Sequence, residues 1–97
     1  MNAYFKDYKV KAYAKGFITC LRMMKNSKTG RYFERQVAVP VDGIRSIEEL
    51  YLDDLGRGVR IIMDGPKNID VIGAEMKHVS NAIAFSYKGT VIRDDDE

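Results

Sequence analysis

Two polar turn segments separate short runs of β-forming residues, and they restrict the fold of this chain more than any other feature. Residues 25–31 include no apolar side chain and supply Asn, Ser and Gly, which hydrogen-bond their own backbone or accept a positive φ. Residues 64–68 place Gly and Pro between two β-branched runs. Each segment predicts a hairpin, so we expect antiparallel β-structure.

The first hairpin begins with a half-buried strand over residues 8–15. Apolar side chains alternate there with polar or aromatic ones, and the exposed face comprises Lys9, Lys11, Tyr13 and Lys15. Gly16 predicts a bulge or bend, because residues 17–24 carry large side chains on both sides and lose the earlier alternation. We therefore expect a second strand to begin after Gly16 and to run into the 25–31 turn.

The returning strand is predicted over residues 32–41. Its core side should comprise Phe33, Val37, Val39 and Val41. Pro40 cannot donate a hydrogen bond to a β-ladder, so the strand should end there or lie at a sheet edge. The second hairpin is predicted from residues 59–63 and 69–72.

Residues 44–55 are compatible with two structures. Ser46 followed by Glu49 is a capping-box signature, apolar residues fall at helical spacing, and Gly56 could end a helix, which favours a short helix over 47–55. The alternative is a strand over 44–48 followed by a long loop, which would continue an antiparallel meander.

A C-terminal helix is predicted over residues 74–85. Met76, Val79 and Ile83, with Ala82 as a further candidate, form one apolar stripe for packing on a sheet. His78 falls off this stripe, so we expect it on the surface. Residues 87–92 could add an edge strand, and the acidic residues 94–97 should be disordered because adjacent carboxylates repel one another.

A chain of 97 residues forms one hydrophobic core, so residues 1–93 are predicted to be a single domain followed by an acidic tail. The expected fold is α+β: an antiparallel sheet of four or five strands in two hairpins, with a C-terminal helix packed on one face. The single cysteine, Cys20, is expected to be a buried apolar residue in a reducing compartment. No signal-peptide-like or membrane-spanning run occurs, which predicts a cytoplasmic protein without a membrane partner.

Charge is distributed unevenly along the chain. Residues 1–41 hold nine Lys or Arg against two acidic residues, a net charge of +7, whereas residues 42–97 hold seven against twelve, a net charge of −5. Such a polarity can steer an acidic protein or a nucleic acid to one surface, or allow two copies of the chain to associate head to tail.

Candidate catalytic chemistry is sparse. His78 is the only histidine and Cys20 the only cysteine, so no His pair, Cys/His cluster or independent Ser-His-Asp set is present. The carboxylates at Asp53 and Asp54 and in the 94–97 tail lack the interleaved spacing of a calcium loop. We therefore predict a protein that is not an enzyme and that needs no metal or cofactor.

Part of the chain resembles a known family. Residues 41–49, 58–65 and 69–72 followed by a short helix resemble the strand, strand, strand, helix pattern of the small FlbD/SwrD-type proteins of flagellar operons. The resemblance covers about half of the chain and implies a non-enzymatic accessory protein in which residues 41–49 are sheet. The insertion at 50–57 and the basic N-terminal hairpin depart from that pattern, and no functional residue is carried over.

The N-terminal hairpin carries the best candidate binding surface, since residues 1–41 combine nine basic residues with seven of the ten Tyr and Phe residues. Aromatic, Met and Arg side chains are enriched in protein interfaces. The leading hypothesis is a non-catalytic module that binds a protein with an acidic surface, as a phage- or operon-encoded inhibitor or adaptor would. The alternative is binding of single-stranded RNA or DNA, where cations hold phosphates and rings stack on bases. The candidate contacts are Lys9, Lys11, Tyr13, Lys15, Met23, Arg31, Tyr32 and Arg35.

Overall fold

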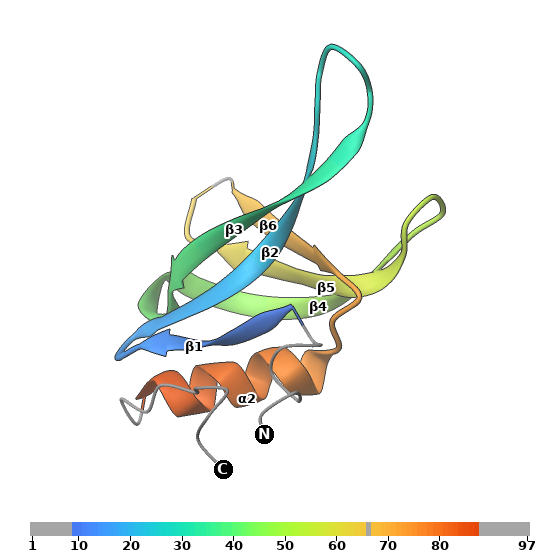
Figure 1. The fold of residues 1–97 in the computed structure, drawn as a ribbon. Coiled ribbons are helices and arrows are strands. Elements are labelled where there is room, and N and C mark those ends of the chain that lie inside the picture. Colours follow the sequence, from blue (N-terminus) through green and yellow to red (C-terminus); the bar gives the residue numbers. More distant parts are fainter. Residues whose placement is uncertain (1–8, 66, 88–97) are drawn as a thin grey trace, which may run out of the picture.

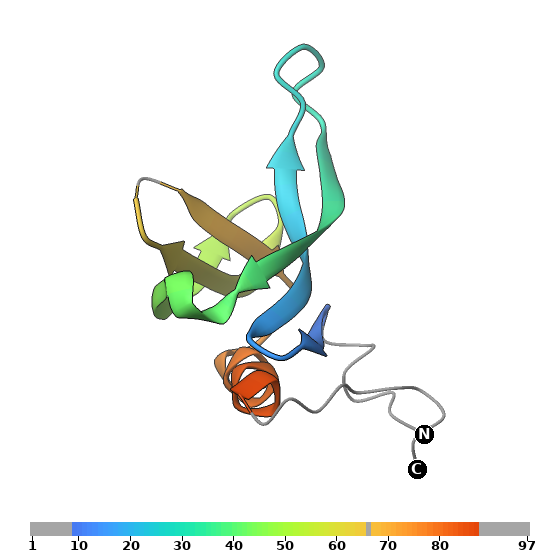
Figure 2. The same ribbon diagram turned by 90° about the vertical axis from the view of Figure 1, so that its left-hand side faces the viewer.

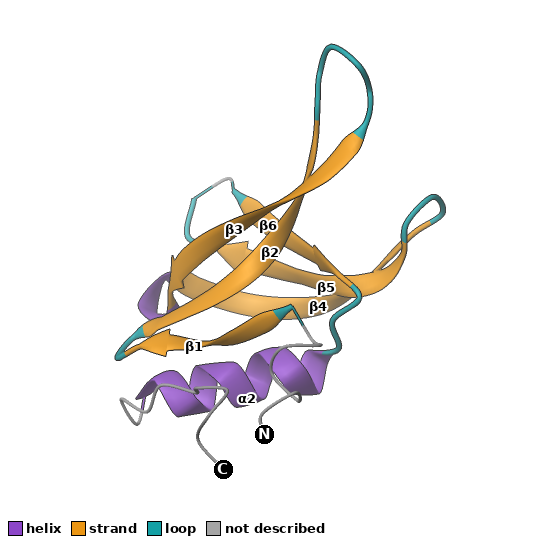
Figure 3. Ribbon diagram, in the orientation of Figure 1, coloured by secondary structure: helices purple, strands orange, loops and turns teal. Residues whose placement is uncertain are grey.

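The computed structural model describes residues 9–65 and 67–87. It comprises two three-stranded antiparallel sheets and one C-terminal α-helix (Figures 1 and 3). The first sheet has the order β1 (Val10–Ala14), β2 (Phe17–Lys25) and β3 (Tyr32–Pro40). The second has the order β4 (Ile44–Leu52), β5 (Gly56–Met63) and β6 (Asn68–Ile72). The helix α2 spans Met76–Tyr87.

The prediction of one sheet of four or five strands is therefore wrong, although the α+β class and the antiparallel pairing are confirmed. The division occurs at Pro40, where β3 ends as expected because proline has no N–H to donate. A short 3₁₀ turn, η1 (Val41–Gly43), then redirects the chain, and β4 pairs with β5 instead of extending the first sheet. Each sheet can thus bury one face against the other.

The core lies between the two sheets and the helix. Figure 2 shows the sheets side by side with α2 below them, and β2 contacts β6 while α2 contacts β1 and β2. Fully buried side chains come from every layer, including Ile18, Val59, Ile61, Val71 and Val79. Burial of a valine or isoleucine side chain contributes about 1.5 to 3 kcal/mol, so this shared interface supplies the main stabilisation of the fold.

Residues 44–52 form a strand, and the predicted short helix over 47–55 is wrong. The strand pairs with β5 along its whole length, from Ile44 opposite Met63 to Leu52 opposite Gly56. A turn at residues 53–55 replaces the long loop of the alternative, and Gly56 supplies a φ of 91° there. Pairing with a neighbouring strand satisfies the backbone hydrogen bonds that a three-turn helix would have made locally, which outweighs the capping-box signal.

The strands of the first hairpin and the C-terminal helix lie largely where the sequence predicted them. Phe33 is an exception: it was expected in the core and is 39% exposed, because the distal half of the β2–β3 hairpin extends beyond the second sheet. In α2, Val79 and Ala82 are buried, and Met76 and Ile83 pack partly buried against the core. Tyr87 belongs to the helix; the rest of the proposed 87–92 strand and the 94–97 tail lie outside the described residues.

His78 is buried, not on the surface as predicted, with only 2% of its area exposed. Its Nδ1 accepts a hydrogen bond from the backbone N–H of Glu75 at 3.2 Å, while the Glu75 carbonyl accepts the N–H groups of His78 and Val79. His78 thus takes the place that Glu or Gln occupies in a capping box. The imidazole folds back over the start of the helix, which the apolar-stripe argument does not consider.

Candidate binding surface

The distal half of the β2–β3 hairpin projects from the body of the molecule (Figures 1 and 2). We call residues 22–35 the arm. Every residue from 25 to 36 is exposed, so both faces of this two-stranded ribbon contact solvent over most of its length. A ribbon that buries little surface contributes little to folding. The side chains of the arm are therefore available for binding.

The arm ends in a tight, hydrogen-bonded turn, as residues 25–31 predicted. Asn26 Oδ1 accepts the backbone N–H groups of Lys28 and Thr29 at 2.8 and 3.1 Å, and the Asn26 N–H donates to the Arg31 carbonyl at 2.8 Å. Gly30 adopts a φ of 74°, a conformation that a side chain would strain. These bonds fix the positions of the cations Lys28 and Arg31 at the tip.

The face of the first sheet that points away from the second sheet is called the outer face. The strand register places on it Lys11, Phe17, Thr19, Leu21, Met23, Lys25, Tyr32, Glu34, Gln36 and Ala38, and Tyr13 lies at its edge, in the register shift of β1 between Ala12 and Ala14. No described helix or strand lies over this face in Figure 2, although Thr19 on it is buried. Tyr13, Phe17 and Tyr32 remain 54, 41 and 40% exposed on it.

The charges on the outer face are largely compensated. Lys9, which precedes β1, donates through Nζ to Oε2 of Glu34 at 2.9 Å. Lys25 Nζ lies 5.3 Å from the centre of the Tyr32 ring, in cation–π range. A hollow of about 200 Å³ opens near Lys9, Lys11 and Gln36. The outer face is thus a mixed aromatic and polar surface with modest net charge.

The structure divides the predicted contacts among several surfaces. Lys11, Tyr13, Met23 and Tyr32 share the outer face, and Lys9 reaches the same side through Glu34. The other three lie elsewhere: Lys15 in the β1–β2 turn, Arg31 at the arm tip, and Arg35 on the opposite face of the arm.

We call that opposite side the core-side face of the arm, because it continues the face that buries Cys20 and Val39 nearer the body. It comprises Arg22, Met24, Phe33 and Arg35. Arg22 and Arg35 are direct cross-strand partners, as are Met24 and Phe33. Arg22 and Phe33 were not among the predicted contacts, and Phe33 was predicted to be a core residue; pairing the two strands outward from the 25–31 turn would have brought the arginines together.

The thiol of Cys20 and the imidazole of His78, the two most reactive types of side chain in the protein, are both buried. Burial raises the pKa of the Cys20 thiol to about 11, so it is a neutral apolar residue as expected. Burial also lowers the pKa of His78; the Glu75 carboxylate opposes this by a smaller amount, and the Lys77 ammonium adds to it. Residues 9–65 and 67–87 hold no cluster of three or more His, Cys, Asp or Glu side chains that could hold a metal ion.

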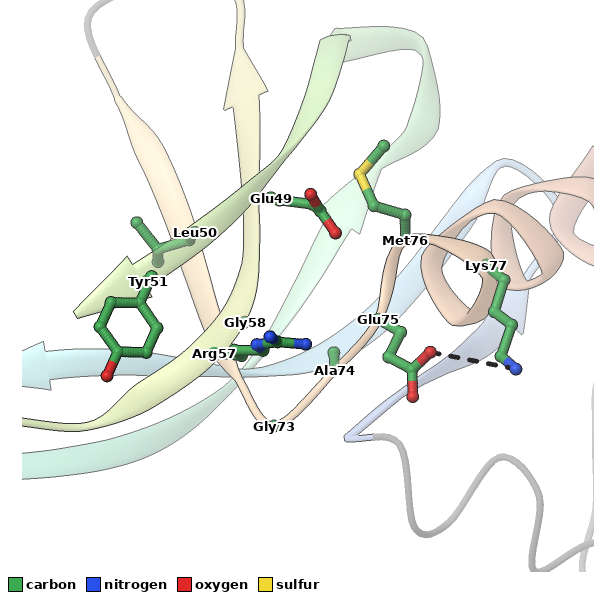
Figure 4. A pocket seen from close by; sticks show the side chains of 10 residues that line it. All are labelled: Glu49, Leu50, Tyr51, Arg57, Gly58, Gly73, Ala74, Glu75, Met76 and Lys77. Atoms are coloured by element: carbon green, nitrogen blue, oxygen red, sulfur yellow. Dashed lines mark ion pairs between the residues drawn. The ribbon is translucent and has the colours of Figure 1, made fainter. Parts of the chain in front are cut away.

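A larger hollow, of about 760 Å³, lies between the β4–β5 strands and the residues 73–77 that lead into α2 (Figure 4). Its acidic members are Glu49 and Glu75, and its basic members are Arg57 and Lys77. Lys77 Nζ lies 3.9 Å from Oε1 of Glu75. A lining of balanced and partly paired charges lacks the convergent polar groups that orient a small ligand. The arm is the stronger candidate.

Comparison of this chain with family models, with curated proteins and with solved structures found no match. Among the described residues, no helix combines the length and the apolar character needed to cross a membrane.

Proposed function

We propose that this protein is a non-catalytic binding module that uses the outer face of its first sheet to hold another protein. The observation that carries the proposal is the exposure of Tyr13, Phe17 and Tyr32 on a sheet face that no described element covers. The exposed parts of these rings add little to the stability of the isolated chain, whereas tyrosine is among the residues that contribute most to protein interfaces.

The chemistry of the outer face favours a protein over a polyanion. Glu34 neutralises Lys9, and the remaining cations, Lys11 and Lys25, are few compared with the aromatic, Met and Leu side chains around them. Rigid rings and a deformable Met23 suit an interface with a mixed surface. These two lysines, which no carboxylate of the described residues neutralises, favour an acidic rim on the partner and should act mainly on the association rate.

An inhibitor or adaptor fits this arrangement, because its action requires a contact surface and no reactive group. A second copy of the chain is a further occupant for the same face. These outcomes are distinguished by the mass of the isolated protein in solution: self-association would double it in a concentration-dependent manner, and a foreign partner would not.

The test begins with capture from a nuclease-treated lysate on the immobilised chain, followed by calorimetry with the purified partner. Tyr32→Ala should weaken that partner's binding by about tenfold or more, as expected for an aromatic hot spot. Tyr51→Ala is the matched control, because Tyr51 is 65% exposed on β4 in the other sheet. Equal losses in both variants, or no partner after nuclease treatment, would remove the outer face from the mechanism.

A further inference from the structure

We propose that the core-side face of the arm is a separate site for single-stranded nucleic acid, in which Arg22 and Arg35 hold the phosphate backbone and Phe33 stacks on a base. This inference does not depend on a protein partner at the outer face. It follows from the side chains that the hairpin register places together on the other face of the arm.

The first observation is a pair of like charges. Arg22 on β2 and Arg35 on β3 are direct neighbours across the ladder, where side chains lie about 5 Å apart at Cβ. Neither makes an ion pair with a carboxylate of the described residues; the one acidic residue of the arm, Glu34, is on the outer face and bonded to Lys9. Opposed like charges destabilise a hairpin, so a bound anion would relieve a repulsion that the free protein carries.

The second observation is that one of these arginines is already oriented. The Nη2 atom of Arg22 donates to the backbone carbonyl of Asn68, at the start of β6, at 3.2 Å. This bond uses one of five guanidinium donors and limits the rotation of the group. Arg35 lies opposite it and is exposed, and its guanidinium N–H groups make no hydrogen bond to the described residues. Together they present donors suited to the oxygens of a phosphate.

The third observation is the next cross-strand pair, Met24 and Phe33, on the same face. Phe33 is 39% exposed and lies two residues from Arg35, about 7 Å along the strand. A ring and a cation that alternate along one face match the base and phosphate of a single strand. Lys28 and Arg31 at the tip extend the basic path beyond the ring.

The same observations disfavour other ligands. A paired duplex keeps its bases stacked on one another and would leave Phe33 without a base to stack on. An acidic peptide could neutralise the arginines, but it carries no regular planar group for the ring. A single strand offers phosphates to the two arginines and a base to the Phe33 ring.

The experiment is fluorescence anisotropy of the full chain with a labelled oligothymidylate of about 16 nucleotides, at several salt concentrations, beside a duplex of equal length. Phe33→Leu should weaken binding about tenfold, as loss of one stacked base does. Arg35→Ala should weaken binding and reduce the salt slope by about 0.7, the value for one phosphate contact on a single strand. Circular dichroism and the thermal midpoint verify that each variant is folded.

Matched controls lie on the outer face of the same arm. Tyr32→Leu removes a ring of the same exposure, and Lys25→Ala removes a cation at the position paired with it. Both should stay within about threefold of wild type, since long-range attraction alone changes affinity modestly. Equal losses on the two faces, a duplex bound as tightly as the single strand, or no binding at low salt would each overturn the proposal.

Discussion

In the β5–β6 hairpin, Arg60 lies directly opposite Asp70, and its Nε and Nη2 donate to the two carboxylate oxygens at 2.8 and 3.1 Å. In the β2–β3 hairpin, Arg22 lies directly opposite Arg35, and no carboxylate accompanies them on that face. The hydrogen bonds to Asp70 and its negative charge raise the pKa of the Arg60 guanidinium. The arginine pair of the arm has no such stabilisation.

The difference separates a hairpin built for stability from one that is available for binding. The β5–β6 hairpin contributes Val59, Ile61 and Val71 to the core, and its cross-strand charges complement each other. No residue from 21 to 38 is buried, and the cross-strand charges of the arm repel each other. Surfaces that a fold does not need for its own stability are where binding groups can accumulate.

The largest contrast is expected from the glycines of the two hairpins. A Cβ at Gly58 would lie 2.3 Å from the Val71 carbonyl oxygen, so Gly58→Ala must force β5 and β6 apart. We expect a loss of about 3 kcal/mol in the free energy of unfolding, measured by urea denaturation. Gly30→Ala meets no atom within 4 Å and should cost only about 1 kcal/mol, for its φ of 74°. Similar losses in the two variants would contradict the contrast.

Removal of the paired charge should have a moderate effect. Asp70→Ala leaves Arg60 without its bidentate acceptor, and we expect a loss of about 1 kcal/mol in the same measurement, because the pair is only partly shielded from solvent. Asp64→Ala is the control, since its contact with Arg45 is 3.8 Å long and both side chains are about 70% exposed. That variant should change stability by at most a few tenths of a kcal/mol.

Low pH should reduce the free energy of unfolding through protonation of His78. Because burial lowers the pKa of His78 in the folded state, the unfolded chain binds the proton first as the pH falls below the ordinary value of 6.5. Stability is therefore highest above that pH and declines below it, until the folded pKa is reached. In His78→Gln, which retains an acceptor for the Glu75 N–H, unfolding curves between pH 7 and pH 5 should show a smaller decline. An unchanged decline would exclude His78 as its source.

The smallest effect has the opposite sign. Arg35→Asp replaces the like charge opposite Arg22 with a complementary one, so the protein should become more stable by about 0.5 kcal/mol, seen as a higher thermal midpoint. Lys28→Asp is the control for a change of net charge alone, since the Lys28 side chain is exposed at the arm tip and makes no ion pair or ring contact with the described residues. A midpoint raised equally in both variants would mean that overall charge, and not the opposed arginines, causes the strain.

Local sequence predicted most of the elements because their signals act over a few residues. The 25–31 and 64–68 turns, the alternation around Val10 and Ala12, and the stripe containing Val79 all specify backbone conformations through neighbouring side chains. The helix favoured over residues 47–55 was wrong, because helical spacing and a capping box are local preferences of a few tenths to about 1 kcal/mol. Pairing with β5 satisfies the backbone hydrogen bonds of β4 and outweighs those local preferences.

The candidate surfaces were predictable only in part for the same reason. Alternation alone predicted an exposed Tyr13, and its side chain is 54% exposed, although a register shift between Ala12 and Ala14 interrupts the alternation there. It could not show that Phe33 lies past the edge of the second sheet, nor that Glu34 would neutralise Lys9, since both depend on how separate strands are aligned. The burial of His78 likewise depends on a side chain folding back on its own helix.

The sequence by itself determined the α+β class, the antiparallel pairing and an N-terminal hairpin rich in cations and rings, because turn chemistry, side-chain period and charge are properties of neighbouring residues. Only the tertiary structure decided that the strands form two sheets, and that the arm has one compensated face and one face with opposed arginines. Those outcomes depend on register and packing between distant segments. Shifting a strand by one residue exchanges its faces, and no local signal fixes that choice.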